Sequence, residues 1–192
     1  MAEKKFNNVY GPKKITPKGV LVYPHLNKPD TYEGKTQYKT KIRVAADDSD
    51  MAAFIVTCDE FAKDAAEKCG KKLSKRPWVI EDETGDYILS AHSNLDNKPV
   101  LKDTQKNIIS DDTPVWGGSV ARLRATIFGY TGLGGGVTLL LDSVCIYDLV
   151  TGANAGGEEF PDEEGYVTST KDSSTDADGS DGEDLGDDDL PF

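Results

Sequence analysis

The chain has 192 residues, with 22 Lys and Arg against 34 Asp and Glu, and a formal net charge of −12. Taken as one number, this charge argues against a nucleic-acid-binding protein, whose usual footprint is a basic surface. The charge is unevenly distributed, however. Residues 1–156 carry 21 basic and 20 acidic groups, whereas residues 157–192 carry 14 acidic groups and one basic residue, Lys171. The sequence therefore predicts a near-neutral body followed by a strongly acidic segment.

Composition limits the class of protein further. The body is the size of one ordinary domain and is large enough for a hydrophobic core. No apolar run approaches the roughly 20 residues that span a bilayer, and the charged N-terminus lacks the apolar stretch of a signal peptide. The chain has three cysteines, which do not make a disulfide framework. We therefore expect no membrane association and a location in a reducing cytoplasm.

Two strands are expected in the first 45 residues. Val20–Tyr23 is a short apolar strand that Pro24 should stop. Lys35–Val44 alternates with a period of two, which predicts a half-buried strand. One face is apolar or hydroxylic, and the other is almost purely cationic: Lys35, Gln37, Lys39, Lys41 and Arg43. This second face is either part of a nucleic-acid-binding groove or a lysine-rich strand edge that prevents aggregation.

A helix follows these strands. Ser49 or Asp50 can cap its start, and Gly70 can end it. Its apolar stripe repeats at spacings of three and four and consists of Phe54, Cys58, Phe61, Ala65 and Cys69.

The remaining signals of the body are β. Trp78–Ile80 and Tyr87–Leu89 flank a turn and predict a hairpin. Short strands are expected at 100–101 and 108–109, and long ones at 120–130 and 137–147. One helix among six or seven strands favours a mainly β fold built on a small barrel. From about Gly152 the composition is dominated by Gly, Asp, Glu, Ser and Thr, so we expect a disordered tail.

The strand Val120–Tyr130 carries the strongest functional signal of the body. Alternate residues suit a barrel interior, and the opposite face presents Arg122, Arg124, Phe128 and Tyr130. Single-stranded nucleic acid uses both kinds of side chain, with guanidinium groups at phosphates and rings under bases. The alternative is that the two rings pack under the helix or under a partner subunit.

Other candidates for base stacking are the two tryptophans. Trp116 precedes Gly117 and Gly118, and Trp78 follows a basic pair; either ring is equally consistent with a place in the core. The loop Thr131–Gly136 resembles a phosphate cradle only superficially. It joins two strands and lacks the ending of a P-loop, so we interpret it as a hairpin loop.

Signals for an enzyme are absent from the sequence. His25 and His92 have no neighbouring Cys or His at metal-ligand spacing, and no nucleophile elbow or Cys-His signature occurs. Acidic residues at 176–181 approach a calcium loop but are out of register with it. We expect no catalytic activity, no cofactor and no metal.

The last six residues form a distinct motif. Three carboxylates precede an apolar tip, in the order Asp187, Asp188, Asp189, Leu190, Pro191 and Phe192. A solvated acidic tail has no reason to end on a large aromatic ring. The pattern predicts a partner-binding anchor, whose ring enters a pocket while the aspartates steer the encounter.

The tip closely resembles the C-terminal tip of bacterial single-stranded DNA-binding protein. The body resembles the OB-fold single-stranded DNA-binding proteins of tailed bacteriophages, through the segments 116–125 and 134–144. The resemblance implies a five-stranded or slightly larger OB-fold-like barrel with one helix, over residues 1–155. It implies an acidic tail, over residues 156–192, that competes with DNA and carries the partner-binding tip. One departure is that the usual OB helix links strands three and four, whereas this helix follows the second strand. Either an extra strand lies within residues 8–15 or the topology is a variant.

The sequence therefore predicts a phage single-stranded DNA-binding protein for replication, recombination and repair, located in the host cytoplasm. The DNA-binding residues are expected to be Lys35, Lys39, Lys41, Arg43, Arg122, Arg124, Phe128, Tyr130 and Trp116. The expected partners are single-stranded DNA and replication proteins (a DNA polymerase, a helicase or primase), and a homodimer is compatible with the pattern. The alternatives are a double-stranded-DNA or RNA-binding accessory protein and a phage structural or adaptor protein.

Overall fold

The structure, a computed structural model, describes residues 8–152. The expected acidic tail and its tip lie outside these residues. The described elements are β1 (Val9–Ile15), β2 (Gly19–Tyr32), β3 (Lys35–Val44), α1 (Ser49–Cys69), β4 (Trp78–Ile80), β5 (Tyr87–Asn94), β6 (Val100–Lys102), β7 (Val120–Tyr130) and β8 (Gly136–Asp148). The prediction of a mainly β fold with one helix is confirmed for this part of the chain.

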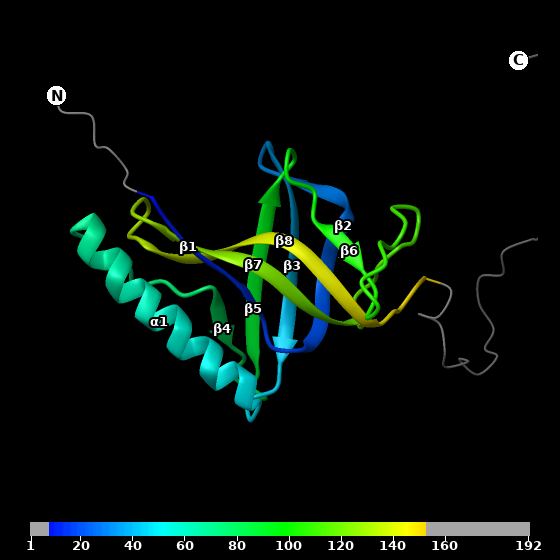
Figure 1. The fold of residues 1–192 in the computed structure, drawn as a ribbon, viewed down its shortest axis with the longest axis horizontal. Coiled ribbons are helices and arrows are strands. Elements are labelled where there is room, and N and C mark those ends of the chain that lie inside the picture. Colours follow the sequence, from blue (N-terminus) through cyan, green and yellow to red (C-terminus); the bar gives the residue numbers. More distant parts are fainter. Residues whose placement is uncertain (1–7, 153–192) are drawn as a thin grey trace, which may run out of the picture. The chain divides into compact units, whose positions relative to one another are not determined.

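Five of the strands close into a barrel. The order of neighbours is β2, β3, β5, β8 and β7, and β7 returns to β2 through the pairs Gly19↔Ala121 and Val20↔Val120. All these neighbours are antiparallel except β5 and β8, which run parallel. Figure 1 shows the long strands β7 and β8 crossing β3 and β5. The expected small barrel is thus present.

Three further strands lie outside the barrel. β1 pairs with β7, β4 pairs with β5, and β6 pairs with β8. The extra strand within residues 8–15 therefore exists, but it does not belong to the barrel. Because α1 still connects the second and third barrel strands, β3 and β5, the fold also has the variant helix position.

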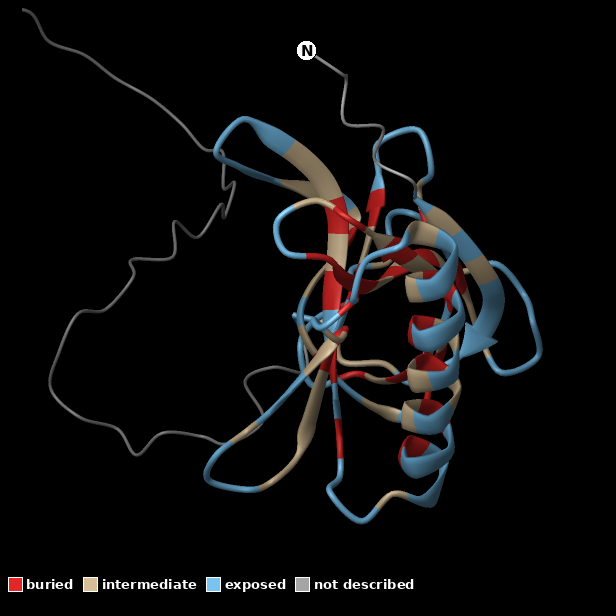
Figure 2. Cartoon of the chain, turned by 90° about the vertical axis from the view of Figure 1, so that its left-hand side faces the viewer, coloured by how far each residue is buried: buried red, intermediate tan, exposed pale blue. Residues whose placement is uncertain are grey.

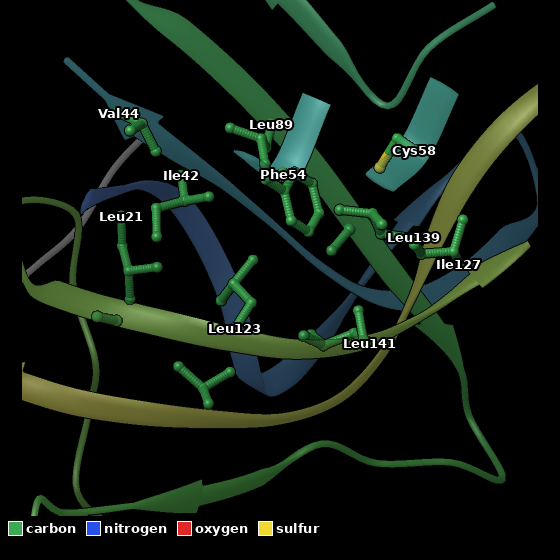
Figure 3. Packing of buried hydrophobic residues seen from close by; sticks show 14 of the residues in the cluster. Leu21, Ile42, Val44, Phe54, Cys58, Leu89, Leu123, Ile127, Leu139 and Leu141 are labelled. Carbon is green, nitrogen blue, oxygen red and sulfur yellow. The ribbon is translucent and has the colours of Figure 1, made fainter. Parts of the chain in front are cut away.

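Alternate residues of the barrel strands build the core (Figure 3). Leu21, Ile42, Leu123 and Leu139 are among its most deeply buried side chains. They follow the period of two that places one face of each strand inside. Since Leu123 and its same-face neighbours on β7 are buried, the predicted inner face of Val120–Tyr130 is confirmed.

The helix packs its apolar stripe onto this core. Phe54, Cys58 and Ala65 are buried as predicted, whereas Phe61 and Cys69 are only half-buried. Figure 2 shows the buried side of the helix turned toward the strands. The start of the helix differs from the prediction by one residue, because the carboxylate of Asp48 accepts the hydrogen bond from the Met51 N–H at 2.8 Å.

Two strand predictions are wrong. Pro24 does not stop the first barrel strand, which continues to Tyr32. Between Val22↔Lys41 and His25↔Lys39, β2 has one residue more than β3, so the strand bulges here instead of ending. Residues 108–109 do not form a strand, since Ile108 makes only an isolated bridge with Lys102.

Candidate nucleic-acid interface

The alternation predicted for β3 is confirmed. Tyr38, Thr40, Ile42 and Val44 are buried, and the intervening side chains face outward. Two of the outward cations are neutralised by neighbours: Lys39 pairs with Asp30, and Arg43 pairs with Glu81 at 2.9 Å. Within the described part of the chain, Lys35 and Lys41 form no ion pair, so they are the cations of this face that are free to meet a phosphate.

A hollow of about 440 Å³, here called the β3 hollow, lies along this cationic face. Its floor combines β3 with the neighbouring strand β5. The residues that matter for binding are Tyr23, His25, Gln37, Lys39, Lys41 and His92. The hydrogen bond from Lys39 holds the pKa of Asp30 below its usual value. That carboxylate therefore competes for Lys39 with any incoming phosphate.

The second hollow, here called the aromatic hollow, adjoins the first. Its volume is about 380 Å³, and Ser90 and His92 line both hollows. The aromatic hollow is walled by Trp78 from β4 and by Phe128 and Tyr130 from β7. The three rings come from strands far apart in the sequence, and each is only partly exposed.

Phe128 and Tyr130 do not pack under the helix. Between them, Gly129 faces α1, because a Cβ added there would meet Leu73, Ala65 and Phe61. The side chains on either side point the other way, and the ring of Phe128 lies 4.8 Å from that of Tyr10 on β1. Their role in base stacking stays a prediction, but they face the hollow in which it would occur.

Trp116 lines a third hollow, the Trp116 hollow, of about 740 Å³. Tyr23 and His25 belong to both this hollow and the β3 hollow. The indole of Trp116 is 51% exposed, so it is not a core residue. The three adjoining hollows form one path, here called the groove, which crosses the outer face of β3 and β5 and reaches β2 at one end and β7 and β8 at the other.

Tyr23 is an aromatic groove residue that the sequence did not reveal. It lies on the β2 bulge with a left-handed φ of 47°, and its side chain is 78% exposed. Proline has no N–H to donate to a neighbouring strand, so Pro24 suits a bulge. The bulge in turn directs Tyr23 outward between two hollows. A strained backbone that presents an exposed ring is the kind of feature found at functional sites.

His92 lies where the β3 and aromatic hollows meet. Burial lowers the pKa of its imidazole below the usual value, and the positive charge of Lys35 lowers it further. The ring is therefore neutral at pH 7. A neutral ring in a groove offers a stacking surface and one hydrogen-bond donor without adding charge.

The arginines of β7 lie apart from the β3 lysines. Arg122 donates a hydrogen bond to the Asp50 carboxylate at 2.9 Å, in the first turn of α1. Arg124 lies 3.6 Å from Asp142, which also pairs with Lys13. Neither arginine lines the three hollows of the groove. The arginines of β7 therefore lie outside the groove, and phosphate binding by them stays a prediction from the sequence.

The glycine-rich segment 131–135 joins β7 to Gly136, the first residue of β8, as the hairpin interpretation expects. Leu133 at its tip is 91% exposed, and Gly134 and Gly135 have positive φ angles. In OB folds, oligonucleotides bind on the face of the second and third barrel strands, between the loop after the first strand and the loop after the fourth. Here those strands are β3 and β5, and the latter loop is 131–135.

Metal sites and membrane-spanning helices can be looked for in residues 8–152. No group of three or more His, Cys, Asp or Glu side chains there is placed to hold a metal ion. The described helix is too polar to cross a bilayer. The anchor predicted at Asp187–Phe192 lies outside the described residues.

Similar solved structures are phage proteins. No family model matches the chain, and no curated protein does. Bacteriophage T7 gp2.5, a single-stranded DNA-binding protein, superposes with a TM-score of 0.60 at 18% identity, covering 83% of this chain and 100% of gp2.5. The chain has the OB fold of phage single-stranded DNA-binding proteins.

The protein from bacteriophage Enc34 supports the same fold. In complex with single-stranded DNA, it matches with a TM-score of 0.61 at 16% identity, over 72% of this chain and 88% of the Enc34 chain. Without DNA, the TM-score is 0.57 at 16% identity, over 77% and 87% of the two chains. The predicted OB-fold-like barrel with one helix is thereby confirmed.

Proposed function

We propose that this protein is a non-enzymatic single-stranded DNA-binding protein and that the groove on β3 and β5 is its binding site. The observation that carries the proposal is the combination of a free cation and exposed rings along one path. Lys41 supplies charge for the phosphates, while Tyr23 and Trp116 supply faces for the bases. Stacked bases and neutralised phosphates are the two sources of affinity in single-strand binding. The Enc34 protein, which shares the fold, binds single-stranded DNA.

The first test uses the intrinsic fluorescence of Trp78 and Trp116, which line the aromatic and Trp116 hollows. Titration with oligothymidylate should quench this fluorescence at low stoichiometry. A double-stranded oligonucleotide of equal length should compete poorly. Equal competition would favour the alternative, a double-stranded-DNA or RNA-binding protein. No binding at low salt, even without residues 157–192, would favour a structural or adaptor protein.

A matched pair of variants tests whether the groove binds phosphates through Lys41. Lys41→Ala removes a free cation of the groove, whereas Lys63→Ala removes an exposed lysine of α1. The slope of log affinity against log salt should fall by about one unit for Lys41→Ala, and Lys63→Ala should keep the wild-type slope. Equal slopes for all three proteins would move the phosphate path away from β3.

We further propose that the protein acts in phage replication, recombination and repair, and that its acidic tail recruits replication proteins. The sequence Asp187–Phe192 supports this, because an apolar tip after three aspartates suits a pocket with a basic rim. Deleting Phe192 alone should leave single-strand binding unchanged and abolish capture of a phage DNA polymerase or helicase. If single-strand binding were lost as well, the tip would have a different role.

A further inference from the structure

A fourth hollow, here called the β5–β6 hollow, lies outside the groove described above. Its volume is about 560 Å³, within the roughly 300–1,000 Å³ typical of small-molecule sites. Polar side chains predominate around it, and the residues that matter here are Lys13, Ser93, Asn94, Asn97, Lys98 and Leu140. The function proposed so far assigns no role to this hollow.

The hollow exists because the sheet has a gap. β5 pairs with β8 only at Ala91↔Leu139 and His92↔Leu140. β6 then joins the same edge of β8, starting at Val100↔Ser143. Between these pairs, Leu141 and Asp142 have no neighbouring strand on that side. The intervening chain turns away, and the Asn97 N–H donates to the carbonyl of Asn94 at 3.0 Å.

An unsatisfied hydroxyl faces this gap. Ser93 is 5% exposed and lines the hollow, yet its Oγ has no hydrogen-bond partner. Buried polar atoms are almost always hydrogen-bonded. Among the described residues, the other buried side-chain atom without a partner is Oε1 of Gln37, which lines the β3 hollow. The two residues occupy adjacent rungs of the β3–β5 ladder, Gln37↔Asn94 and Tyr38↔Ser93. Neighbouring residues of a strand point to opposite faces, so the two unpaired groups open onto different hollows, Gln37 onto the β3 hollow and Ser93 onto the β5–β6 hollow.

The strands also make the two regions continuous. On β7, Phe128 lines the aromatic hollow and Thr126 the β5–β6 hollow. On β8, Thr138 and Leu140 are divided in the same way. Residues two apart share one face of a strand and lie about 7 Å apart along it. A DNA strand that leaves the aromatic hollow along this face therefore arrives at the β5–β6 hollow.

We propose that the β5–β6 hollow is a nucleobase subsite at the end of the groove. Ser93 Oγ and the amides of Asn94 and Asn97 can each donate and accept hydrogen bonds, which matches the mixed edge of a base. Leu140 supplies an apolar floor. Lys13 and Lys98 are held by Asp142 at 2.8 Å and by Asp111 at 2.6 Å, so their charge is already neutralised and the subsite binds through its hydrogen-bonding groups. This inference rests on the proposed single-strand binding. It adds hydrogen-bonded recognition of one base to the stacking in the groove.

The sharpest variant is Ser93→Ala, because it removes the hydroxyl and little else. Since no protein group bonds to Oγ, the melting temperature should stay the same or rise. Affinity for the shortest oligonucleotide that binds fully should fall about three- to tenfold, the range that one net hydrogen bond supplies. The matched control is Thr16→Val. Thr16 Oγ1 donates to Pro17 and accepts from the Leu123 N–H, so this variant should lose stability and keep its affinity.

A second measurement identifies the ligand group as a base. One abasic residue is placed at the 5′ end or at the 3′ end of that oligonucleotide, which leaves the phosphates intact. Wild type should lose about three- to tenfold in affinity at one end only. Ser93→Ala should show no further loss at that end, because the base and the hydroxyl then report one interaction.

Each outcome decides the question. Unchanged affinity in Ser93→Ala, or equal abasic losses in the two proteins, would overturn the subsite while leaving the groove intact, provided that Lys41→Ala still weakens binding. If Ser93→Ala weakens binding but the abasic ends have no effect, the hydroxyl does not bind a base and the proposal is wrong. If wild type binds no single-stranded DNA, the proposed function and the subsite fail together.

Discussion

Arg122 and Lys41 are both outward cations on barrel strands, but their surroundings differ. Arg122 is held by Asp50 in the first turn of α1 and also reaches the carbonyl of Thr16, whereas Lys41 has no ion pair among the described residues. A cation that already has a carboxylate gains less from a phosphate. The sequence predicted both residues to bind DNA, but of the two only Lys41 has no carboxylate partner in the described part of the chain.

For Arg122→Ala, we expect the free energy of unfolding to fall by about 1 kcal/mol, the upper end for exposed ion pairs. The salt dependence of single-strand binding should stay at its wild-type slope. Urea unfolding and a salt titration of affinity measure the two quantities. A slope lowered by about one unit would instead place Arg122 at the phosphates, as its position in the sequence suggested.

His92 gives a prediction on pH. Its pKa in the folded protein is lowered by burial and by Lys35, while an unfolded histidine titrates near roughly 6.5. Below that pH, His92 is protonated in the unfolded chain. In the folded protein it stays neutral until the pH reaches its lower pKa. The free energy of unfolding should therefore decrease as the pH falls from about 6.5 toward the folded pKa.

The variant His92→Gln should lose this part of the decrease. Thermal unfolding at several pH values between neutral and mildly acidic conditions measures the effect. His25→Gln is the matched control and should keep the contribution of His92. An identical pH dependence in wild type and His92→Gln would show that His92 is not buried as described.

At the scale of elements, the sequence was most informative where one face of a strand is buried. The alternation of Lys35–Val44 and Val120–Tyr130 predicted both β3 and β7 with their correct bounds and faces. Such a pattern is local, so it can be recognised without the rest of the fold. The helix was predicted for the same reason.

The β2 bulge and the groove could not be predicted in this way. Proline is compatible with a strand end and with a bulge, and only pairing with β3 distinguishes the two. The groove depends on which strands become neighbours. Tyr23 and Lys41 are close in the sheet, whereas Arg122 faces α1. The spacing of these residues along the chain does not predict which of them become neighbours.

The bulge itself leads to a prediction about Tyr23→Gly. Glycine adopts a φ of 47° without the cost that tyrosine incurs there, and the tyrosine ring is mostly exposed. The free energy of unfolding should therefore change little or increase. Single-strand affinity should decrease by the loss of one stacked base, about 1–3 kcal/mol.

Tyr147→Ala is the control for this variant, since Tyr147 is an exposed ring that lies near Lys18 and lines none of the hollows of the groove. Fluorescence titration and urea unfolding of the three proteins separate the two effects. Wild-type affinity in Tyr23→Gly would mean that the strained tyrosine serves something other than DNA.

At the scale of the whole molecule, the charge of −12 combines two opposite contributions. Residues 1–156 have a net charge of +1, and residues 157–192 have a net charge of −13. We expect the acidic segment to compete with DNA for the groove, because both are polyanions. Apparent DNA affinity then decreases with the fraction of molecules whose groove is occupied.

Deleting residues 157–192 should therefore tighten single-strand binding, by about tenfold if the tail occupies the groove nine-tenths of the time. Because this competition is electrostatic, the gain should be largest near 0.05 M salt and should shrink toward 1 M, where the Debye length is only about 3 Å.

A tail of equal length with its Asp and Glu replaced by Asn and Gln should behave like the deletion, since it removes the charge but keeps the chain. If the neutral tail still inhibited binding, the competition would come from the volume of the tail or from its apolar tip instead of its charge. Weaker binding after the deletion would contradict autoinhibition altogether, because it would mean that the acidic segment assists DNA binding.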